Sequence, residues 1–165
     1  MRYTYFDLGT GYRATEVAAD RIGDRHRMSY DRAVNRSELD RISVQVAGAW
    51  SYRNEGDQEL HQRVPGMVSS ELGDSLAAGV YSFVALTPDA RHYCIRKLDK
   101  STPFAPGILR VSSGAEFFVP HGKFLFLCAG QIEIGGSYQG ERYFMHAESA
   151  AVQAYAVTDA LGLLL

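Results

Sequence analysis

The stretch Gly114–Gly136, GAEFFVPHGKFLFLCAGQIEIGG, decides the fold class of this chain. Alternating and apolar runs bounded by Pro-Gly and Gly-Gly signals are typical of short β-strands joined by tight turns. The stretch therefore predicts three consecutive strands, at Glu116–Val119, Lys123–Cys128 and Gln131–Ile134.

The middle strand of the three is apolar on both faces. Successive side chains of a strand point to opposite sides, so Phe124 and Phe126 share one face and Leu125 and Leu127 share the other. A strand with two apolar faces is typical of the inside of a sandwich or barrel. We therefore expect all four side chains to be buried, and the alternating strand that follows to have one face in water.

The rest of the chain from residue 42 onward repeats this pattern. Apolar residues recur with a period of two, and Pro-Asp, Asn-Glu-Gly and Gly-Gly turn signals separate the runs at intervals of about eight to twelve residues. The clearest further strands are Ile42–Trp50, Val80–Thr87, Arg91–Leu98, Ile108–Ser112, Glu141–His146 and Ala151–Val157. No amphipathic helix of ordinary length interrupts them, so the sequence predicts an all-β domain over 42–165, an antiparallel sandwich or jelly-roll barrel.

The segment 1–41 differs in character from the rest. It begins with a candidate strand, Met1–Leu8, and the spacing of Ala14, Val17, Ala18 and Ile22 predicts one short helix. Between residues 13 and 41 it holds seven arginines against six acids. Because it offers little apolar surface, we expect an extended arm whose ion pairs lie against a neighbouring subunit. The predicted oligomer contacts are Arg13, Arg21, Arg25, Arg27, Arg32, Arg36 and Arg41.

Composition restricts the partners and the compartment. A formal net charge of -2 gives no overall attraction to nucleic acid or to an anionic membrane, so neither is expected as a partner. The N-terminus lacks the apolar core of a signal peptide, which predicts an intracellular protein or a component of an assembled particle. Cys94 and Cys128 both occupy apolar strand patterns, so buried free thiols are expected, with a single disulfide between strands as the alternative.

The opening stretch also contains part of a known motif. Gly114, five residues, Pro120, one residue and Gly122 reproduce the first half of the second cupin motif, G-x5-P-x-G-x2-H-x3-N. On these residues the chain resembles the cupin-like jelly-roll superfamily, and the resemblance implies a turn that leads into a strand of a small barrel. The motif's metal-ligand position falls on Leu125 and its asparagine position on Ala129, so the metal site is not carried over.

The five histidines show no local metal-binding pattern, because no two are spaced i,i+2 or i,i+4. No metal and no cofactor is expected. The alternative metal ligands are His121, His146 and Glu148, with Glu133 on the adjacent strand, which neighbouring strands could bring together. Gly140, five residues, His146, one residue and Glu148 also resemble a piece of the first cupin motif.

Two classes of function follow from these patterns. The main hypothesis is a non-enzymatic assembly protein, a homo-oligomer of the kind found among viral or phage particle components such as capsid-decorating proteins; this is an analogy of architecture. The alternative is a cupin-like domain that binds a small molecule as a sensor, or a metal-dependent cupin enzyme. A closed core of Phe and Leu would favour the first, and a barrel with a polar pocket would favour the second.

Overall fold

The computed structural model describes residues 1–35, 40–69, 75–99, 101 and 104–165. This part of the chain contains eighteen β-strands, all paired antiparallel, and no α-helix, which confirms the all-β prediction. It also contains no helical segment that could cross a membrane. The chain divides into two compact units, Met1–Phe104 and Ala105–Leu165, called here the N-terminal and C-terminal units.

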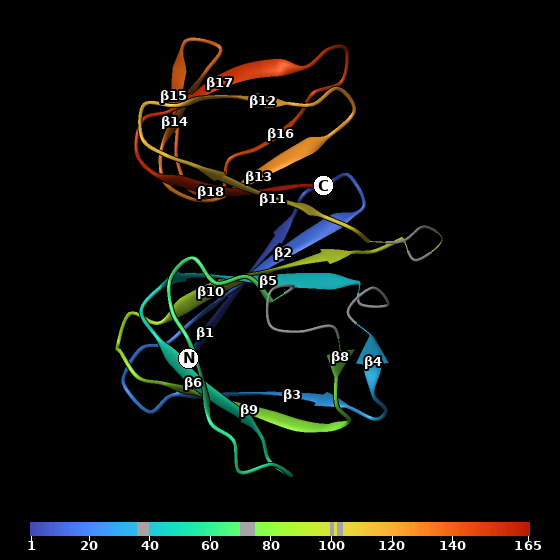
Figure 1. Cartoon of the computed structure of the whole chain (residues 1–165), viewed down its shortest axis with the longest axis vertical. Coiled ribbons are helices and arrows are strands. Elements are labelled where there is room, and N and C mark those ends of the chain that lie inside the picture. Colours follow the sequence, from blue (N-terminus) through green and yellow to red (C-terminus); the bar gives the residue numbers. More distant parts are fainter. Residues whose placement is uncertain (36–39, 70–74, 100, 102–103) are drawn as a thin grey trace. The chain divides into compact units, whose positions relative to one another are not determined.

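The C-terminal unit is a jelly roll that contains the stretch Gly114–Gly136. Its strands form two four-stranded sheets (Figure 1). Sheet III has the order β11 (Gly107–Val111), β18 (Ala160–Leu164), β13 (Phe124–Ala129) and β16 (Phe144–His146). Sheet IV has the order β12 (Glu116–Val119), β17 (Val152–Ala156), β14 (Ile132–Ile134) and β15 (Ser137–Gln139). Counted from one to eight along the chain, the sheets read 1-8-3-6 and 2-7-4-5, the connectivity of a double-sheet jelly roll.

A closed apolar core fills this unit. Its buried members are Phe117, Val119, Leu125, Leu127, Ile132, Ile134, Ala147, Ala154, Ala156 and Ala160. The expectation for β13 is confirmed at Leu125, Phe126 and Leu127, each at most 1% exposed. It is wrong for Phe124, which is only partly buried and stacks its ring on Phe144 and His146 of the neighbouring β16.

The N-terminal unit also consists of two four-stranded sheets (Figure 1). Sheet I has the order β1 (Arg2–Asp7), β2 (Tyr12–Ala18), β10 (Arg91–Lys97) and β5 (Arg41–Ala47). Sheet II has the order β3 (Arg25–Tyr30), β9 (Gly79–Ala85), β6 (Trp50–Asn54) and β7 (His61–Arg63). A separate two-stranded ladder joins β4 (Val34–Asn35) to β8 (Ser75–Leu76).

The connectivity of the N-terminal unit repeats that of the C-terminal unit. The sixth strand position is taken by Val68, which makes an isolated bridge to Val44 of β5. Without the additional edge strand β1 and the small ladder, the sheets again read 1-8-3-6 and 2-7-4-5. The chain therefore contains two jelly rolls, where the sequence predicted one.

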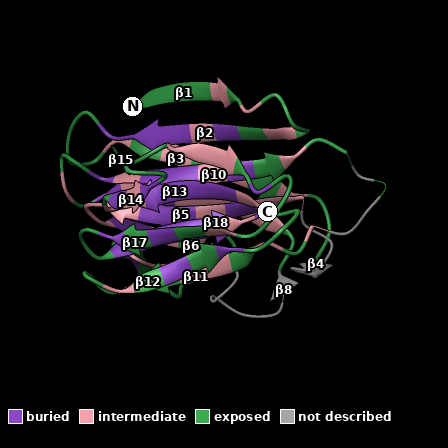
Figure 2. Ribbon diagram, turned by 90° about the horizontal axis from the view of Figure 1, so that it is seen from above, coloured by how far each residue is buried: buried purple, intermediate pink, exposed green. Residues whose placement is uncertain are grey.

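The described residues of segment 1–41 do not form an extended arm: β1 and β2 belong to sheet I, β3 to sheet II and β4 to the small ladder. The predicted first strand is present as β1, which is largely exposed, whereas the predicted helix is the strand β2 (Figure 2). Ala14 and Val17 suit either structure, and hydrogen bonds to β1 on one side and β10 on the other select the strand. The apolar surface that the segment lacks comes from β9 and β10, far along the chain. The boundary between compact units accordingly follows Phe104 rather than residue 41.

Candidate functional site

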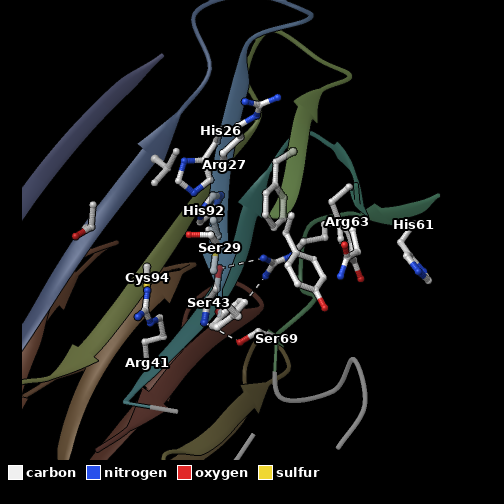
Figure 3. A pocket seen from close by; sticks show the side chains of 18 of the residues that line it. His26, Arg27, Ser29, Arg41, Ser43, His61, Arg63, Ser69, His92 and Cys94 are labelled. Atoms are coloured by element: carbon white, nitrogen blue, oxygen red, sulfur yellow. Dashed lines mark hydrogen bonds between the residues drawn. The ribbon is translucent and has the colours of Figure 1, made fainter. Parts of the chain in front are cut away.

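A cavity of about 1080 Å³ lies between sheets I and II of the N-terminal unit (Figure 3). Residues of β1, β2, β10 and β5 line one wall, and residues of β3, β9, β6 and β7 line the other. One buried apolar cluster of this unit lies around Trp50, Phe83 and Ala85, and other buried apolar residues, such as Ile42, Val44 and Ile95, alternate along sheet I with residues that line the cavity. The space between the inner faces of sheets I and II holds this cavity, whereas apolar side chains pack together inside the C-terminal jelly roll.

The wall formed by sheet I is polar and arranged in rows. Cross-strand register places Arg13, Arg96 and Arg41 side by side on β2, β10 and β5, and all three line the cavity. Arg13 and Arg96 are exposed, so this arginine row lies at the mouth. Because alternate residues share a face of a strand, the next row inward is Thr15, Cys94 and Ser43, and the deepest lining residues are Val17 and His92.

The arginine row concentrates positive charge. Like charges directly opposite one another on adjacent strands destabilise a sheet, and two such pairs occur here. Asp40 offsets part of the charge, at 3.0 Å from Arg96 Nε and 3.4 Å from Arg41 Nε. Asp7 of β1 is the register partner of Arg13. The whole cavity lining contains five arginines and two acidic residues, so the cavity favours an anionic ligand.

Arg63 adds a buried cation behind this row. The residue is 4% exposed, and it reaches from β7 of sheet II to β5 of sheet I. Its Nη1 donates to Ser43 Oγ and its Nη2 to the Ser43 carbonyl oxygen, both at 3.1 Å (Figure 3). The Ser43 amide in turn donates to Ser69 Oγ at 2.9 Å. These bonds hold the guanidinium in a fixed position beside the cavity, where low solvent access strengthens its field.

The opposite wall, from sheet II, is aromatic. Tyr52 stacks between Phe83 and His61, with ring centroids 5.3 Å and 5.2 Å away and interplanar angles of 20° and 24°. His26 continues the row, its ring 5.7 Å from that of Phe83. Sheet register places these four residues opposite one another on β3, β9, β6 and β7, so the row follows directly from strand pairing.

Two neutral histidines lie at the deep end. His92 is 4% exposed; its ring lies 6.0 Å from that of His26 and 5.8 Å from Trp50, edge to face. Burial lowers the pKa of both histidines, that of His92 strongly with the nearby Arg63 charge adding to the effect. His26 Nδ1 bonds the Tyr3 hydroxyl at 2.9 Å. In the described part of the chain, Nδ1 of His92 has no hydrogen-bond partner.

The alternative metal ligands lie elsewhere, in the C-terminal unit. His121 Nε2 lies 3.1 Å from the backbone oxygen of Glu148, which brings these two residues together. His146 instead stacks on Phe124 at a centroid distance of 4.1 Å, and Glu133 lies on β14 of the other sheet. Among the described residues, no group of three or more His, Cys, Asp or Glu side chains is arranged to hold a metal ion.

The arginines predicted to contact a neighbouring subunit have various surroundings. Arg21 pairs with Asp24 at 3.3 Å and Arg27 with Glu55 at 3.0 Å, both within the N-terminal unit. Arg13 and Arg41 line the cavity, as Arg27 also does. Arg25 lies on β3, Arg32 follows that strand, and Arg36 lies outside the described residues. Oligomer formation through these side chains remains a prediction.

Comparison with known proteins supports the fold. No protein-family model matches the chain, and no curated protein matches it. Among solved structures, the Escherichia coli protein YlbA has a TM-score of 0.63 at 10% identity, covering 98% of this chain and 81% of its own. A cupin 2 conserved barrel domain protein from Leptotrichia buccalis has a TM-score of 0.54 at 8% identity, over 99% and 88%. The chain has a cupin-like fold.

A third similar structure extends the cupin-like comparison. The bacterial pirin YhhW from Escherichia coli, in complex with nickel(II), has a TM-score of 0.54 at 12% identity, over 99% of this chain and 87% of its own. At such identities the likeness concerns the fold alone. It confirms the cupin-like resemblance seen at Gly114, Pro120 and Gly122, and it gives no support to a virion or assembly protein.

Sequence reasoning missed the cavity residues, although their pattern was visible. The strands R-x-T-x-V at Arg13–Val17, H-x-C-x-R at His92–Arg96 and R-x-S-x-Q at Arg41–Gln45 each put polar side chains on one face with a period of two. Such a face is ordinarily interpreted as solvent-facing. Only the pairing of all three strands, and the second sheet opposite them, shows that this face lines an interior.

Proposed function

We propose that the N-terminal unit binds a small organic anion in the cavity between sheets I and II. The observation that carries the proposal is the arginine row Arg13–Arg96–Arg41 at the mouth of a cavity lined by the inner faces of both sheets. Three adjacent guanidinium groups are unfavourable for the sheet by itself. An anionic ligand that accepts hydrogen bonds from them offsets that cost.

The contrast between the two units supports a binding role over a purely structural one. The C-terminal unit has the same connectivity and closes over Leu125, Leu127 and other apolar residues. A barrel with a purely structural role needs only such an apolar core. In the N-terminal unit the cavity between the sheets is instead lined by arginines, serines and histidines, of which Arg63 and His92 are buried and therefore need polar partners. Concave sites with a few convergent polar groups are the usual form of small-molecule sites.

The shape and size of the cavity favour an organic ligand over a simple inorganic ion. Ligand sites have volumes of roughly 300–1,000 Å³, and this cavity, at about 1080 Å³, is slightly larger than that range. Guanidinium groups recognise carboxylates and phosphates through paired N–H donors in one plane. In the proposed complex the anionic group lies at the arginine row, and the organic part extends toward Phe83 and His92.

The test is calorimetric titration with benzoate, citrate and 2-oxoglutarate, with glucose as the neutral comparison. Loss of one charged hydrogen-bond donor costs about 1.5–3 kcal/mol, so Arg13→Gln should weaken binding of the best anion by about tenfold to 150-fold. Arg53→Gln is the matched control, because Arg53 is an exposed arginine of the same unit on β6 and does not line the cavity. Absence of binding by every anion, or equal losses in both variants, would contradict the proposal.

A further inference from the structure

The two walls of the cavity select for more than negative charge. We infer that the organic anion is an aromatic carboxylate with a hydrogen-bonding substituent on the ring opposite its carboxylate, oriented between the arginine row and His92. This inference rests on the proposed function and specifies its ligand class. Three separate features of the cavity support it: the charged mouth, the aromatic wall and the polar deep end.

The aromatic wall provides the surface for a ring. Phe83, Tyr52 and His61 form one nearly parallel stack along sheet II, with interplanar angles of 20° and 24°. Tyr81 and Met28 continue the lining of the same sheet. Aromatic rings prefer other rings at centroid distances of 4.5–7 Å in offset or edge-to-face geometry. A planar ring from a ligand therefore gains contacts here that a flexible aliphatic acid of equal charge does not.

The charged mouth and the aromatic wall face each other across the cavity. The arginines project from sheet I, and the aromatic row belongs to sheet II. A ligand that uses both must carry its charge and its ring in one rigid piece, and a carboxylate attached directly to a ring meets this requirement. Arg63, fixed by Ser43, is a further cation that lines the cavity (Figure 3).

The polar deep end calls for a second hydrogen-bonding group. His92 is almost fully buried, lines the cavity, and leaves Nδ1 without a hydrogen-bond partner among the described residues. A buried nitrogen in this state costs free energy that a ligand can recover by bonding to it. The Tyr3 hydroxyl, bonded to His26, is a second polar group on this cavity.

The spacing along the strand sets the length of the ligand. His92 and Arg96 are four residues apart on β10, which is about 13 Å between their Cα atoms. Both side chains line the cavity from the same face of β10. A single substituted ring with a polar group at each end, together with its hydrogen bonds to the two side chains, has a length of this order, and 4-hydroxybenzoate is the simplest example.

Four probes separate the three features in the wild-type protein: 4-hydroxybenzoate, benzoate, cyclohexanecarboxylate and phenol, each titrated by calorimetry. We expect benzoate to bind about threefold to tenfold more tightly than cyclohexanecarboxylate, because only benzoate offers a ring face. We expect 4-hydroxybenzoate to bind about threefold to tenfold more tightly than benzoate through the bond to His92. Phenol should bind most weakly.

The variant His92→Gln tests whether the ring substituent binds at His92. His92→Gln should abolish the preference for 4-hydroxybenzoate over benzoate, so that the two affinities differ by less than about twofold in the variant. Gln62→His is a matched control for a changed polar side chain, because Gln62 is exposed on β7 and does not line the cavity. If His92→Gln does not fold, the wild-type ratios among the four probes still decide the question.

The outcomes distinguish this inference from the proposal on which it rests. If cyclohexanecarboxylate binds as tightly as benzoate and Arg13→Gln weakens both, organic-anion binding stands and the aromatic class is wrong. If benzoate is preferred but the hydroxyl adds nothing, the orientation toward His92 is wrong. If no carboxylate binds at all, the proposed function itself fails.

Discussion

Replacing Leu125 with Ala tests whether the C-terminal core is as closed as its geometry indicates. Leu125 is 0% exposed on the central strand β13, and the change removes three carbons. At about 0.8 kcal/mol for each buried carbon, the transfer loss is roughly 2.4 kcal/mol. A cavity contribution adds to this, because the end of the Leu125 side chain lies over Gly162, which has no side chain to fill the space; a Cβ at Gly162 would lie 2.9 Å from Leu125 Cδ1. We therefore expect a loss of about 3–5 kcal/mol in the free energy of unfolding.

The measurement is urea unfolding followed by far-ultraviolet circular dichroism on the wild type and two variants. Tyr138→Ala is the control, because Tyr138 lies on β15 of the same unit and is 66% exposed. It should lose less than about 1 kcal/mol. A loss for Leu125→Ala below about 0.5 kcal/mol, or one no larger than the control's, would show that β13 does not carry the core.

Three further predictions concern the backbone, the buried histidine and a buried thiol. Gly48→Ala should lose more than about 2 kcal/mol of stability in the same assay, because φ is +57° and the new Cβ would lie 2.6 Å from neighbouring backbone; Gly66→Ala, at φ +92° with open space around it, should lose less. Burial keeps the pKa of His92 low, so below about pH 6.5 the unfolded chain binds a proton that the folded chain does not. The free energy of unfolding in urea should therefore fall from pH 7.5 to 5.5. This fall should be smaller in His92→Gln, which lacks the imidazole. Cys128 is a free and fully buried thiol, and burial raises its pKa, so a thiol reagent should modify it in urea but scarcely in the native protein; rapid native modification of Cys128 would contradict its burial.

The sequence was sufficient for the fold class because local signals and tertiary structure agree in the C-terminal unit. The turn at Pro120–Gly122 and the doubly apolar β13 lead to the same jelly roll that strand pairing produces. In segment 1–41 the local sequence signals and the tertiary structure disagree. Its strand β2 is stabilised by β10, more than seventy residues away, and no local pattern reveals a partner at that separation.

The site could not be predicted for a related reason. His121 and His146 were the candidate ligands because neighbouring strands could bring them together, and both belong to the C-terminal jelly roll with its filled core. The cavity histidines, His26 and His92, are sixty-six residues apart and meet only because β3 and β10 face each other across two sheets. A strand in which every second residue is polar has the same sequence pattern whether its polar face is in water or lines an interior.

The two units show that connectivity alone does not decide what a jelly roll does. The third strand of each is β5 in one unit and β13 in the other, at the same place in the same sheet order. The inward positions of β13 are Leu125 and Leu127, and those of β5 are Arg41 and Ser43. Apolar side chains at these positions close a core by excluding water, whereas short polar and cationic ones leave a space that a charged ligand can enter. If the N-terminal interior were only a poorly filled core, replacing Ser43 by a larger apolar residue should stabilise the free protein at no cost to any binding. The bond from Arg63 Nη1 to Ser43 Oγ argues against this, because the change would leave a buried guanidinium with one hydrogen bond fewer, and we expect it to weaken both stability and binding.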